Sequence, residues 1–215
     1  MDKTLCVVGA GRMGIGITLS YIHAGLPVTL IDIKPRERGE QAEYFARVLG
    51  DLRRELATLT RLGLLDAAQA DIALGRVRLT TRDDARADLA HARVVFEAVP
   101  ERLDVKRDTF AWLGRACAPD SVIASTTSTF LVTELAALVH APGRFLNAHW
   151  LNPAYLIPLV EVSRGPQTAD AALQDLLAVL RLAGKTPVQC APAAGYIVPR
   201  IQALAMNEAA RMVEE

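Results

Sequence analysis

Residues 5–14 read LCVVGAGRMG, an apolar run followed directly by three glycines with the spacing GxGxxG. The apolar run predicts a strand, and the glycines then open a helix. In such a motif Gly9 allows a tight turn, Gly11 lets the backbone approach a pyrophosphate, and Gly14 permits close packing of helix on strand. Free backbone amides at the start of the helix can then bind phosphate oxygens. The stretch therefore predicts a site for a dinucleotide.

An acidic residue stands where a dinucleotide site of this kind requires one. Asp32 ends the next apolar run, 23 residues after Gly9, and its carboxylate can accept hydrogen bonds from ribose hydroxyls. A carboxylate repels a 2′-phosphate, so the pattern favours NAD as the cofactor, while Arg36 and Arg38 nearby keep NADP open. A flavin-binding or nucleoside-binding Rossmann domain is the other alternative. The residues that this motif predicts to bind the cofactor are Gly9, Gly11, Arg12, Met13, Gly14 and Asp32.

Runs of strand length alternate with helical patterns along the rest of the chain. The predicted strands are Leu5 to Gly9, Val28 to Asp32, Val94 to Val99, Val122 to Ser125 and Phe145 to His149. This alternation predicts an α/β fold with a Rossmann-like, doubly wound, mostly parallel sheet. The charged segment Pro35 to Leu74 predicts a helical hairpin inserted into the sheet order and turning near Gly63. Val77 to Thr80 predicts a short strand after this hairpin.

The last elements lie in the C-terminal part of the chain. Asp170 to Ala183 predicts an amphipathic helix, and Pro187 to Cys190 predicts a short strand. Ile197 to Glu215 predicts a helix that runs to the last residue with no stop signal. We therefore expect an NAD-binding Rossmann-like domain at residues 1–190 and the beginning of an all-helical domain, cut short, at residues 191–215.

Composition argues against several functional classes. The 215 residues are 51% hydrophobic, and 24 basic residues balance 24 acidic ones at a pI near 6.9, so no face for nucleic acid is expected. No apolar run approaches the roughly 18 residues that a spanning helix needs, so no membrane partner is expected. The three cysteines are widely spaced and lack CxxC pairing, which predicts reduced thiols rather than disulfides or a metal site. We expect a cytoplasmic protein that acts on a small molecule.

One of the four histidines stands at a predicted strand end. Open parallel sheets hold their ligands outside the carboxyl ends of the strands, and His149 occupies such an end. Glu161 ends the apolar stretch Leu156 to Val160 twelve residues later, so a hairpin would bring imidazole and carboxylate together. Imidazole can take the proton of an alcohol during hydride transfer, and a carboxylate can fix its tautomer. The alternative is a half-buried structural histidine and a solvated glutamate.

The remaining histidines lie in settings typical of structural or solvated residues. They are His23, His91 and His140. A run of hydroxyl side chains, STTST at residues 125–129, follows the fourth predicted strand. Such a run can cap a helix that begins near Val132. Alternatively, one of its hydroxyls can bind the oxygen of a reacting substrate.

Several spaced motifs together resemble the L-3-hydroxyacyl-CoA dehydrogenase family over nearly the whole chain. They are Val7 to Gly14, Phe96 to Glu101 with Lys106, Ala124 to Thr129, His149 to Pro153, Leu159 to Val162 and Gly195 to Val198. The resemblance implies a Rossmann-like domain with a helical-hairpin insertion, followed by an all-helical domain that forms a homodimer and closes over the substrate. It also implies NAD as the cofactor and a place in fatty acid metabolism.

The resemblance implies roles for individual residues as well. His149 matches the family's general base, Glu161 matches its partner, and Ser128 matches the hydroxyl that contacts the substrate oxygen. Asn152, in the His149 to Pro153 motif, is assigned to the same catalytic group. The positions that match cofactor contacts are Asp32, Glu101 and Lys106.

The chain departs from the family's pattern at two positions. Pro199 stands where the family usually has an asparagine, and Thr126 stands where an asparagine is common. The stretch Asn152 to Leu159 resembles relatives that oxidise free hydroxy acids, such as carnitine or gulonate dehydrogenases. The inserted helices lack an obvious serine and lysine pair for a CoA tail. Three arginines that can bind phosphates instead are Arg47, Arg53 and Arg54.

These features predict an NAD-dependent enzyme that oxidises a secondary 3-hydroxyl to a ketone, as a 3-hydroxybutyryl-CoA dehydrogenase does. A dehydrogenase of a CoA-free hydroxy acid, such as carnitine or a sugar acid, is the first alternative. A non-catalytic NAD-binding protein is the second.

Overall fold

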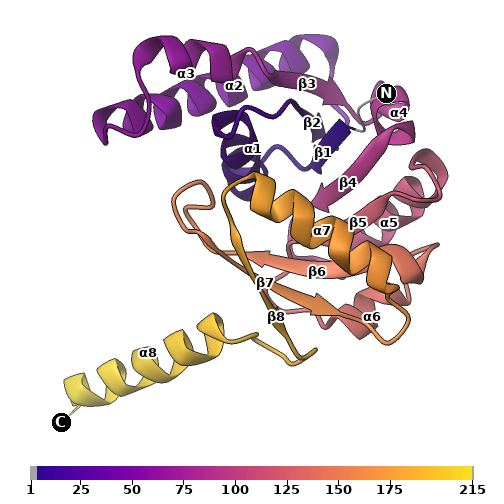
Figure 1. The fold of residues 1–215 in the computed structure, drawn as a ribbon, viewed down its shortest axis with the longest axis vertical. Coiled ribbons are helices and arrows are strands. Elements are labelled where there is room, and N and C mark those ends of the chain that lie inside the picture. The colour runs from indigo at the N-terminus through magenta and orange to yellow at the C-terminus, as the bar shows by residue number, and fades with distance from the viewer. Residues whose placement is uncertain (1–3, 215) are drawn as a thin grey trace.

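The structure is a computed structural model and describes residues 4–214. Its centre is an eight-stranded sheet with the strand order β3-β2-β1-β4-β5-β6-β7-β8 (Figure 1). The strands are β1 Thr4–Val8, β2 Val28–Asp32, β3 Val77–Thr81, β4 Ala92–Glu97, β5 Val122–Ser125, β6 Phe145–Trp150, β7 Leu159–Arg164 and β8 Thr186–Cys190. Neighbouring strands are parallel except β6 and β7, which are antiparallel. The predicted doubly wound, mostly parallel sheet is confirmed.

Helices cover both faces of this sheet. They are α1 Arg12–His23, α2 Arg38–Arg61, α3 Ala67–Leu74, α4 Arg86–Ala90, α5 Leu103–Ala116, α6 Val132–Ala136, the short 3-10 helix Pro142–Arg144, α7 Asp170–Leu182 and α8 Val198–Glu214. Successive side chains of a strand point to opposite faces. Val7 therefore packs in a core with α1 and α7, whereas Cys6 and Val8 pack in a second core with α4, α5 and α6. Burial on both faces explains why inner strands such as β1 and β4 are largely apolar, whereas the edge strands β3 and β8 are less buried and more polar.

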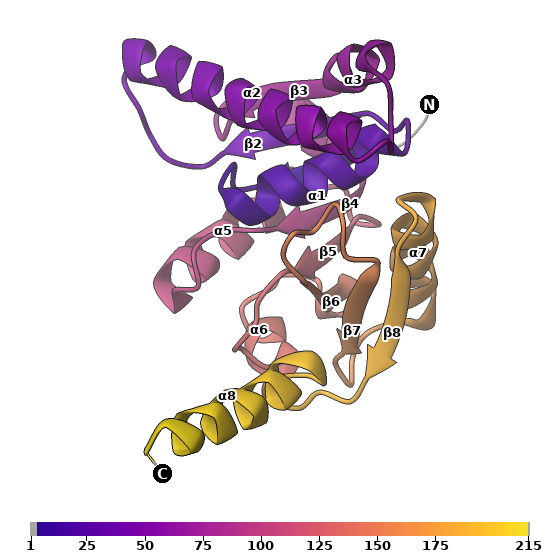
Figure 2. The same ribbon diagram turned by 90° about the vertical axis from the view of Figure 1, so that its left-hand side faces the viewer.

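The predicted helical hairpin is formed by α2 and α3, between β2 and β3 in the chain. Figure 2 shows the two helices side by side over β3 and next to α1. The buried side chains of α2 recur at helical spacing and are Val48, Leu52, Leu56 and Leu59. Gly63 lies in the turn with a φ of 72°, a conformation that glycine adopts without strain. The turn position predicted from the sequence is confirmed.

The last strands form a hairpin followed by a parallel crossover. The β6–β7 register pairs His149 with Glu161. β7 begins at Leu159 rather than at Leu156, where the apolar stretch starts. The backbone amides of Leu156 and Ile157 both donate to the Pro153 carbonyl at 3.0 Å, so they form a turn and cannot pair with a strand. The hairpin is as predicted, but its second strand is displaced toward the C-terminus.

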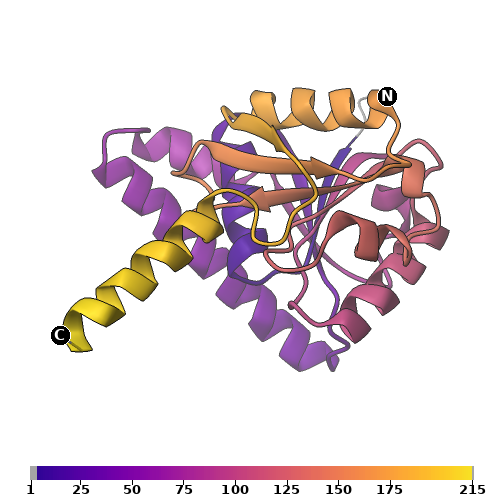
Figure 3. The ribbon, with the colours of Figure 1, turned by 90° about the horizontal axis from the view of Figure 1, so that it is seen from below.

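Helix α8 stands apart from the rest of the fold. Figures 1 and 3 show it extending away from the sheet, and none of its residues is buried. Its apolar side chains include Ile201 and Leu204, which are 61% and 70% exposed. Across the part of the chain that the structure describes, no helix is long and apolar enough to cross a membrane.

Candidate active site

The antiparallel register of β6 and β7 builds a hydrogen-bonded row of three side chains. His149 Nδ1 lies 2.8 Å from Glu161 Oε2, and His149 Nε2 lies 3.1 Å from Ser128 Oγ. Glu161 is fully buried, His149 is 5% exposed, and Ser128 is exposed. A carboxylate at Nδ1 fixes the proton on that nitrogen and leaves Nε2 as the acceptor. The structure therefore brings together an imidazole, the carboxylate that orients it and a hydroxyl that reaches the surface.

The second oxygen of the Glu161 carboxylate binds the start of α8. Glu161 Oε1 accepts hydrogen bonds from the backbone amides of Ile197 at 2.8 Å and Val198 at 2.9 Å. Amides at a helix start have no partner within the helix, and a carboxylate there also interacts favourably with the helix dipole. One buried side chain thus orients the histidine and fixes the entry of the following helix. The sequence reasoning missed this second contact because it joins residues 36 positions apart.

Tyr196 covers the open face of the imidazole. Its ring stacks on His149 with centroids 4.6 Å apart and planes 9° from parallel, and its hydroxyl donates to the Thr127 carbonyl at 2.9 Å. Burial raises the pKa of the Tyr196 phenol above its ordinary value, so it remains a neutral donor. Sequence reasoning did not single out this residue, although the Gly195 to Val198 motif contained it.

Glu101 holds the loop that presents Ser128. Its Oε1 accepts from the backbone amides of Ser128 and Thr129, at 2.9 and 3.0 Å, and from the Thr127 hydroxyl. Burial alone would raise the pKa of this carboxyl, but the Thr127 hydrogen bond and the Lys106 charge hold it below its usual value. The hydroxyl run therefore packs around Glu101 and does not cap α6. The α6 N-cap is Leu131, whose amide donates to Glu134 instead.

Lys106 lies between two carboxylates beneath this loop. Its ammonium group is 2.9 and 3.0 Å from the two oxygens of Glu97 and 3.2 Å from Glu101. Lys106 and Glu97 are both fully buried, and Glu97 also accepts from the Ser125 hydroxyl. A buried charge needs such pairing to be tolerated. Glu97 is a second residue whose part in the site was not foreseen, although it stands in the quoted Phe96 to Glu101 motif.

The glycine turn after β1 is shaped by the backbone rather than by side chains. Gly9 has a φ of 106°, and a Cβ on Gly14 would lie 1.8 Å from the Gly9 carbonyl oxygen. Gly11 is the N-cap of α1, has no side-chain cap, and has nothing within 4 Å of where its Cβ would be. Arg12 and Met13 begin the helix. The amides at this helix start are thus accessible to a phosphate, and the turn fits the pyrophosphate of NAD.

Asp32 ends β2, adjacent to this turn in the sheet. It is 3% exposed, and its Oδ2 accepts from Arg36 Nε at 2.8 Å and from Gln41 Nε2 at 3.3 Å. The guanidinium group of Arg36 also lies over the Tyr44 ring, 3.8 Å from its centroid. The side chain predicted to bind ribose is therefore held in place by two donors from the start of the helical hairpin.

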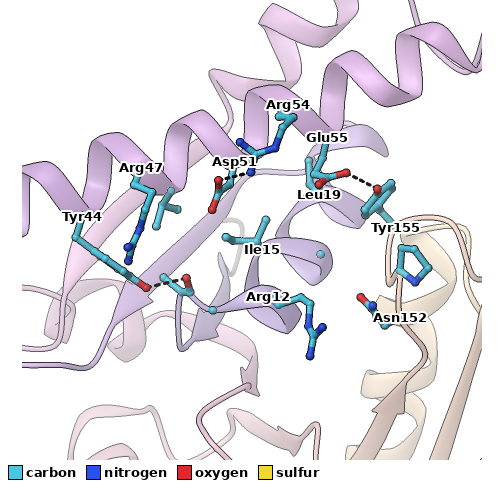
Figure 4. Close-up of a pocket in the computed structure, with 15 residues that line it drawn as sticks. Arg12, Ile15, Leu19, Tyr44, Arg47, Asp51, Arg54, Glu55, Asn152 and Tyr155 are labelled. Carbon is cyan, nitrogen blue, oxygen red and sulfur yellow. Dashed lines mark hydrogen bonds and ion pairs between the residues drawn. The ribbon is translucent and has the colours of Figure 1, made fainter.

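A pocket of about 560 Å³ lies between the start of α1, helix α2 and the β6–β7 loop. Figure 4 shows Arg12 of α1 and Asn152 of the β6–β7 loop near one another among the residues that line it. From the same loop the Tyr155 hydroxyl donates to Glu55, and this contact joins the loop to α2. The α2 residues that line the pocket include Arg47, Asp51, Arg54 and Glu55, whereas Arg53 lines a different cavity. The pocket carries both charge signs beside the predicted cofactor turn.

The fold and the glycine turn define a dinucleotide-binding domain, with a buried histidine–carboxylate pair at the carboxyl end of β6. The sequence profile described as "3-hydroxyacyl-CoA dehydrogenase, NAD binding domain" matches residues 4–193, so the chain belongs to that family. A probable 3-hydroxybutyryl-CoA dehydrogenase of Deinococcus radiodurans is 34% identical, over 97% of this chain and 71% of the relative. L-carnitine dehydrogenase of Streptomyces coelicolor is 37% identical, over 98% of this chain and 63% of the relative.

Structural similarity agrees with the sequence matches. The (S)-3-hydroxybutyryl-CoA dehydrogenase of Ralstonia eutropha superposes with a TM-score of 0.82 at 32% identity, covering 97% of this chain and 70% of that structure. The family expected from the motifs is confirmed, together with NAD as the cofactor and with oxidoreductase activity. Because the relatives are dehydrogenases, the alternative of a non-catalytic NAD-binding protein is not retained.

Proposed function

We propose that this chain catalyses the reversible oxidation of a secondary 3-hydroxyl to a ketone, with a short-chain 3-hydroxyacyl-CoA as substrate. The observation that carries the proposal is the hydrogen-bonded row of Glu161, His149 and Ser128. In this row Nε2 of the imidazole faces the hydroxyl of Ser128, which is exposed to solvent. The names of the Deinococcus and Ralstonia relatives favour 3-hydroxybutyryl-CoA as the substrate. NAD, when bound, accepts the hydride from the carbinol carbon.

The side chains of the row divide the proton chemistry between them. His149 Nε2 takes the proton of the substrate hydroxyl, because its other nitrogen already donates to Glu161. The Glu161 carboxylate stabilises the imidazolium that forms. Ser128 holds the reacting oxygen within reach of Nε2, since its own hydroxyl is already 3.1 Å from that atom. Asn152, on the rim of the adjoining pocket, is assigned to orient the substrate.

The cofactor residues follow the same reasoning. The amides around Gly11 are assigned to the pyrophosphate, with Arg12 and Met13 as the first helical residues beside it. Asp32 is assigned to the adenosine ribose. Glu101 and Lys106 are assigned to the cofactor side of the site. Glu101 holds the loop that presents Ser128, and Lys106 is paired with Glu101.

A CoA-free hydroxy acid is the second candidate substrate, because the pocket in Figure 4 carries carboxylates as well as arginines. CoA carries several phosphate charges, and the wall formed by α2 presents the carboxylates of Asp51 and Glu55. Arg54 is paired with Asp51, so the other cations that line the pocket are Arg12 and Arg47. L-carnitine dehydrogenase, at 37% identity, provides the same indication from the comparisons.

We also propose that residues 191–214 belong to a helical domain through which the protein forms a homodimer. Helix α8 supports this, because apolar side chains such as Ile201 and Leu204 are exposed along it, and such surfaces are commonly covered by another element or subunit. The free cysteines support a cytoplasmic location.

The test is NADH formation, and NADH consumption in the reverse direction, over a panel of 3-hydroxyacyl-CoA esters and free hydroxy acids. Turnover of a CoA ester that is lost in His149→Gln supports the first substrate class. Turnover confined to free acids selects the second. Absence of turnover in both classes, with NADH bound normally, would overturn the proposed reaction.

A further inference from the structure

A second cavity, of about 640 Å³, lies at the carboxyl ends of β2 and β3, away from the pocket in Figure 4. Its walls are the β2–α2 loop, the first turns of α2 and the turn after β3. The residues that line it are Ile33, Lys34, Pro35, Arg36, Arg38, Gln41, Ala42, Phe45, Thr81, Arg82, Asp83 and Asp84. Nothing in the proposed reaction uses this cavity.

The cavity begins at the residue assigned to the adenosine ribose. Arg36 and Gln41 both line it, and both donate to the Oδ2 atom of Asp32. The guanidinium group of Arg36 is fixed between this carboxylate and the Tyr44 ring. The hydrogen bond to Asp32 is the main reason why the pKa of Arg36 is raised above its ordinary value. The Asp32 charge is therefore compensated within the protein, which weakens the repulsion that a bare carboxylate would exert on a nearby phosphate.

Positive charge remains available on the same wall. Lys34 and Arg38 are exposed, and neither side chain forms an ion pair with any residue in the part of the chain described here. The two carboxylates of the cavity, Asp83 and Asp84, lie on the opposite wall, in the turn after β3. Asp84 already accepts from the Thr81 hydroxyl. The β2–α2 side of the cavity thus presents two unpaired cations close to the ribose carboxylate.

We propose that this cavity binds the 2′-phosphate of NADP(H), so that the chain takes NADP(H) as well as NAD(H). The proposal rests on the placement of the adenosine ribose at Asp32 in the proposed function. A phosphate on the ribose 2′-oxygen would extend from Asp32 into the cavity, where Lys34 and Arg38 supply charge-assisted hydrogen bonds. Arg36 contributes by neutralising Asp32 and by its remaining guanidinium donors.

The test measures equilibrium binding of NADH and NADPH by nicotinamide fluorescence, at low and moderate salt. We expect the NADPH dissociation constant to lie within about thirtyfold of that for NADH. Lys34→Ala and Arg38→Ala should each raise the NADPH dissociation constant by about three- to tenfold and leave the NADH dissociation constant unchanged. Arg61→Ala is the matched control, because it removes a cation from the far end of α2 and should affect neither ligand.

Separate results decide the inference and the function on which it rests. The inference is overturned if NADPH binds more than about a hundredfold more weakly than NADH does, or if neither substitution changes the NADPH dissociation constant. Neither result would contradict the NAD site of the proposed function. Competition by inorganic phosphate that equals competition by adenosine 2′-monophosphate would mean that the cations bind free phosphate only, which also overturns it. Failure of NADH itself to bind would instead contradict the proposed function.

Discussion

The glycine turn after β1 and the β6–β7 hairpin lie at the carboxyl edge of one sheet, yet they are built in opposite ways. The turn carries no side-chain contact at its N-cap, and its shape depends on where Cβ atoms are absent. The hairpin is instead held by side-chain contacts, since the Glu161 carboxylate contacts His149, Ile197 and Val198. The first region should therefore be sensitive to added atoms, and the second to removed functional groups. We therefore expect substitutions to separate cofactor binding from proton transfer.

The largest expected effect breaks the chemistry alone. Replacing His149 by Gln keeps a polar side chain of similar reach but removes the proton acceptor. We expect kcat to fall by about a thousandfold, since general-base catalysis contributes on that order, while the NADH dissociation constant stays within a factor of about two. Steady-state kinetics and fluorescence titration check the two values. A parallel loss of activity and cofactor affinity would make His149 a structural residue and remove the distinction between the two regions.

The next effect concerns the backbone region. Gly14→Ala places a Cβ 1.8 Å from the Gly9 carbonyl oxygen, whereas the Cβ of Gly11→Ala meets nothing within 4 Å. We expect Gly14→Ala to lower the free energy of unfolding by about 3 kcal/mol or more, because overpacking against backbone cannot be relieved by a rotamer change. Gly11→Ala should keep its stability and lose cofactor affinity, because it obstructs the approach of the pyrophosphate. Thermal melts with and without NADH separate the two variants; equal stability would show that the turn is more pliable than inferred.

A smaller effect sharpens the side-chain region. Glu161→Gln retains a hydrogen-bonding oxygen but removes the charge that stabilises an imidazolium. We expect kcat to fall ten- to a hundredfold, which corresponds to a rise of about 1.4–2.7 kcal/mol in the activation free energy. We also expect hydrogen exchange at the Ile197 and Val198 amides to become faster. His149→Gln is the control, because it leaves Glu161 Oε1 on those amides and should not change their exchange. Unchanged exchange in Glu161→Gln would mean that α8 is fixed by other contacts.

The same comparison explains what could be predicted from the sequence. The turn after β1 is encoded locally, so its glycines and the acid at Asp32 were identified directly. The contact of His149 with Glu161 was conditional on a hairpin, and the register supplied it. The contacts of Glu161 with α8 and of Tyr196 with His149 depend on how segments distant in the sequence pack, and the contact of Glu97 with Lys106 depends on how α5 packs on the end of β4. Local patterns do not specify such packing, and for that reason these contacts were missed.

The smallest effect tests the segment that joins the two regions. The Ala154 carbonyl, in the β6–β7 loop, accepts from the Ser20 hydroxyl of α1 at 3.1 Å and from Lys185 Nζ at 2.6 Å. Lys185 is 7% exposed, and burial lowers its pKa from 10.5 to about 8. Between these values the unfolded chain binds more protons than the folded one, so stability rises with pH. Relative to Lys185→Met, we expect the wild-type protein to gain about 1–2 kcal/mol between about pH 7 and pH 10. Urea unfolding at each pH gives the difference in the free energy of unfolding between the wild type and Lys185→Met. The contributions of all other titrating groups cancel in this difference. A constant difference would show that the lysine stays charged when folded, held by the carbonyls of Ala154 and Ile157, and that the loop joins the two regions through a permanent cation.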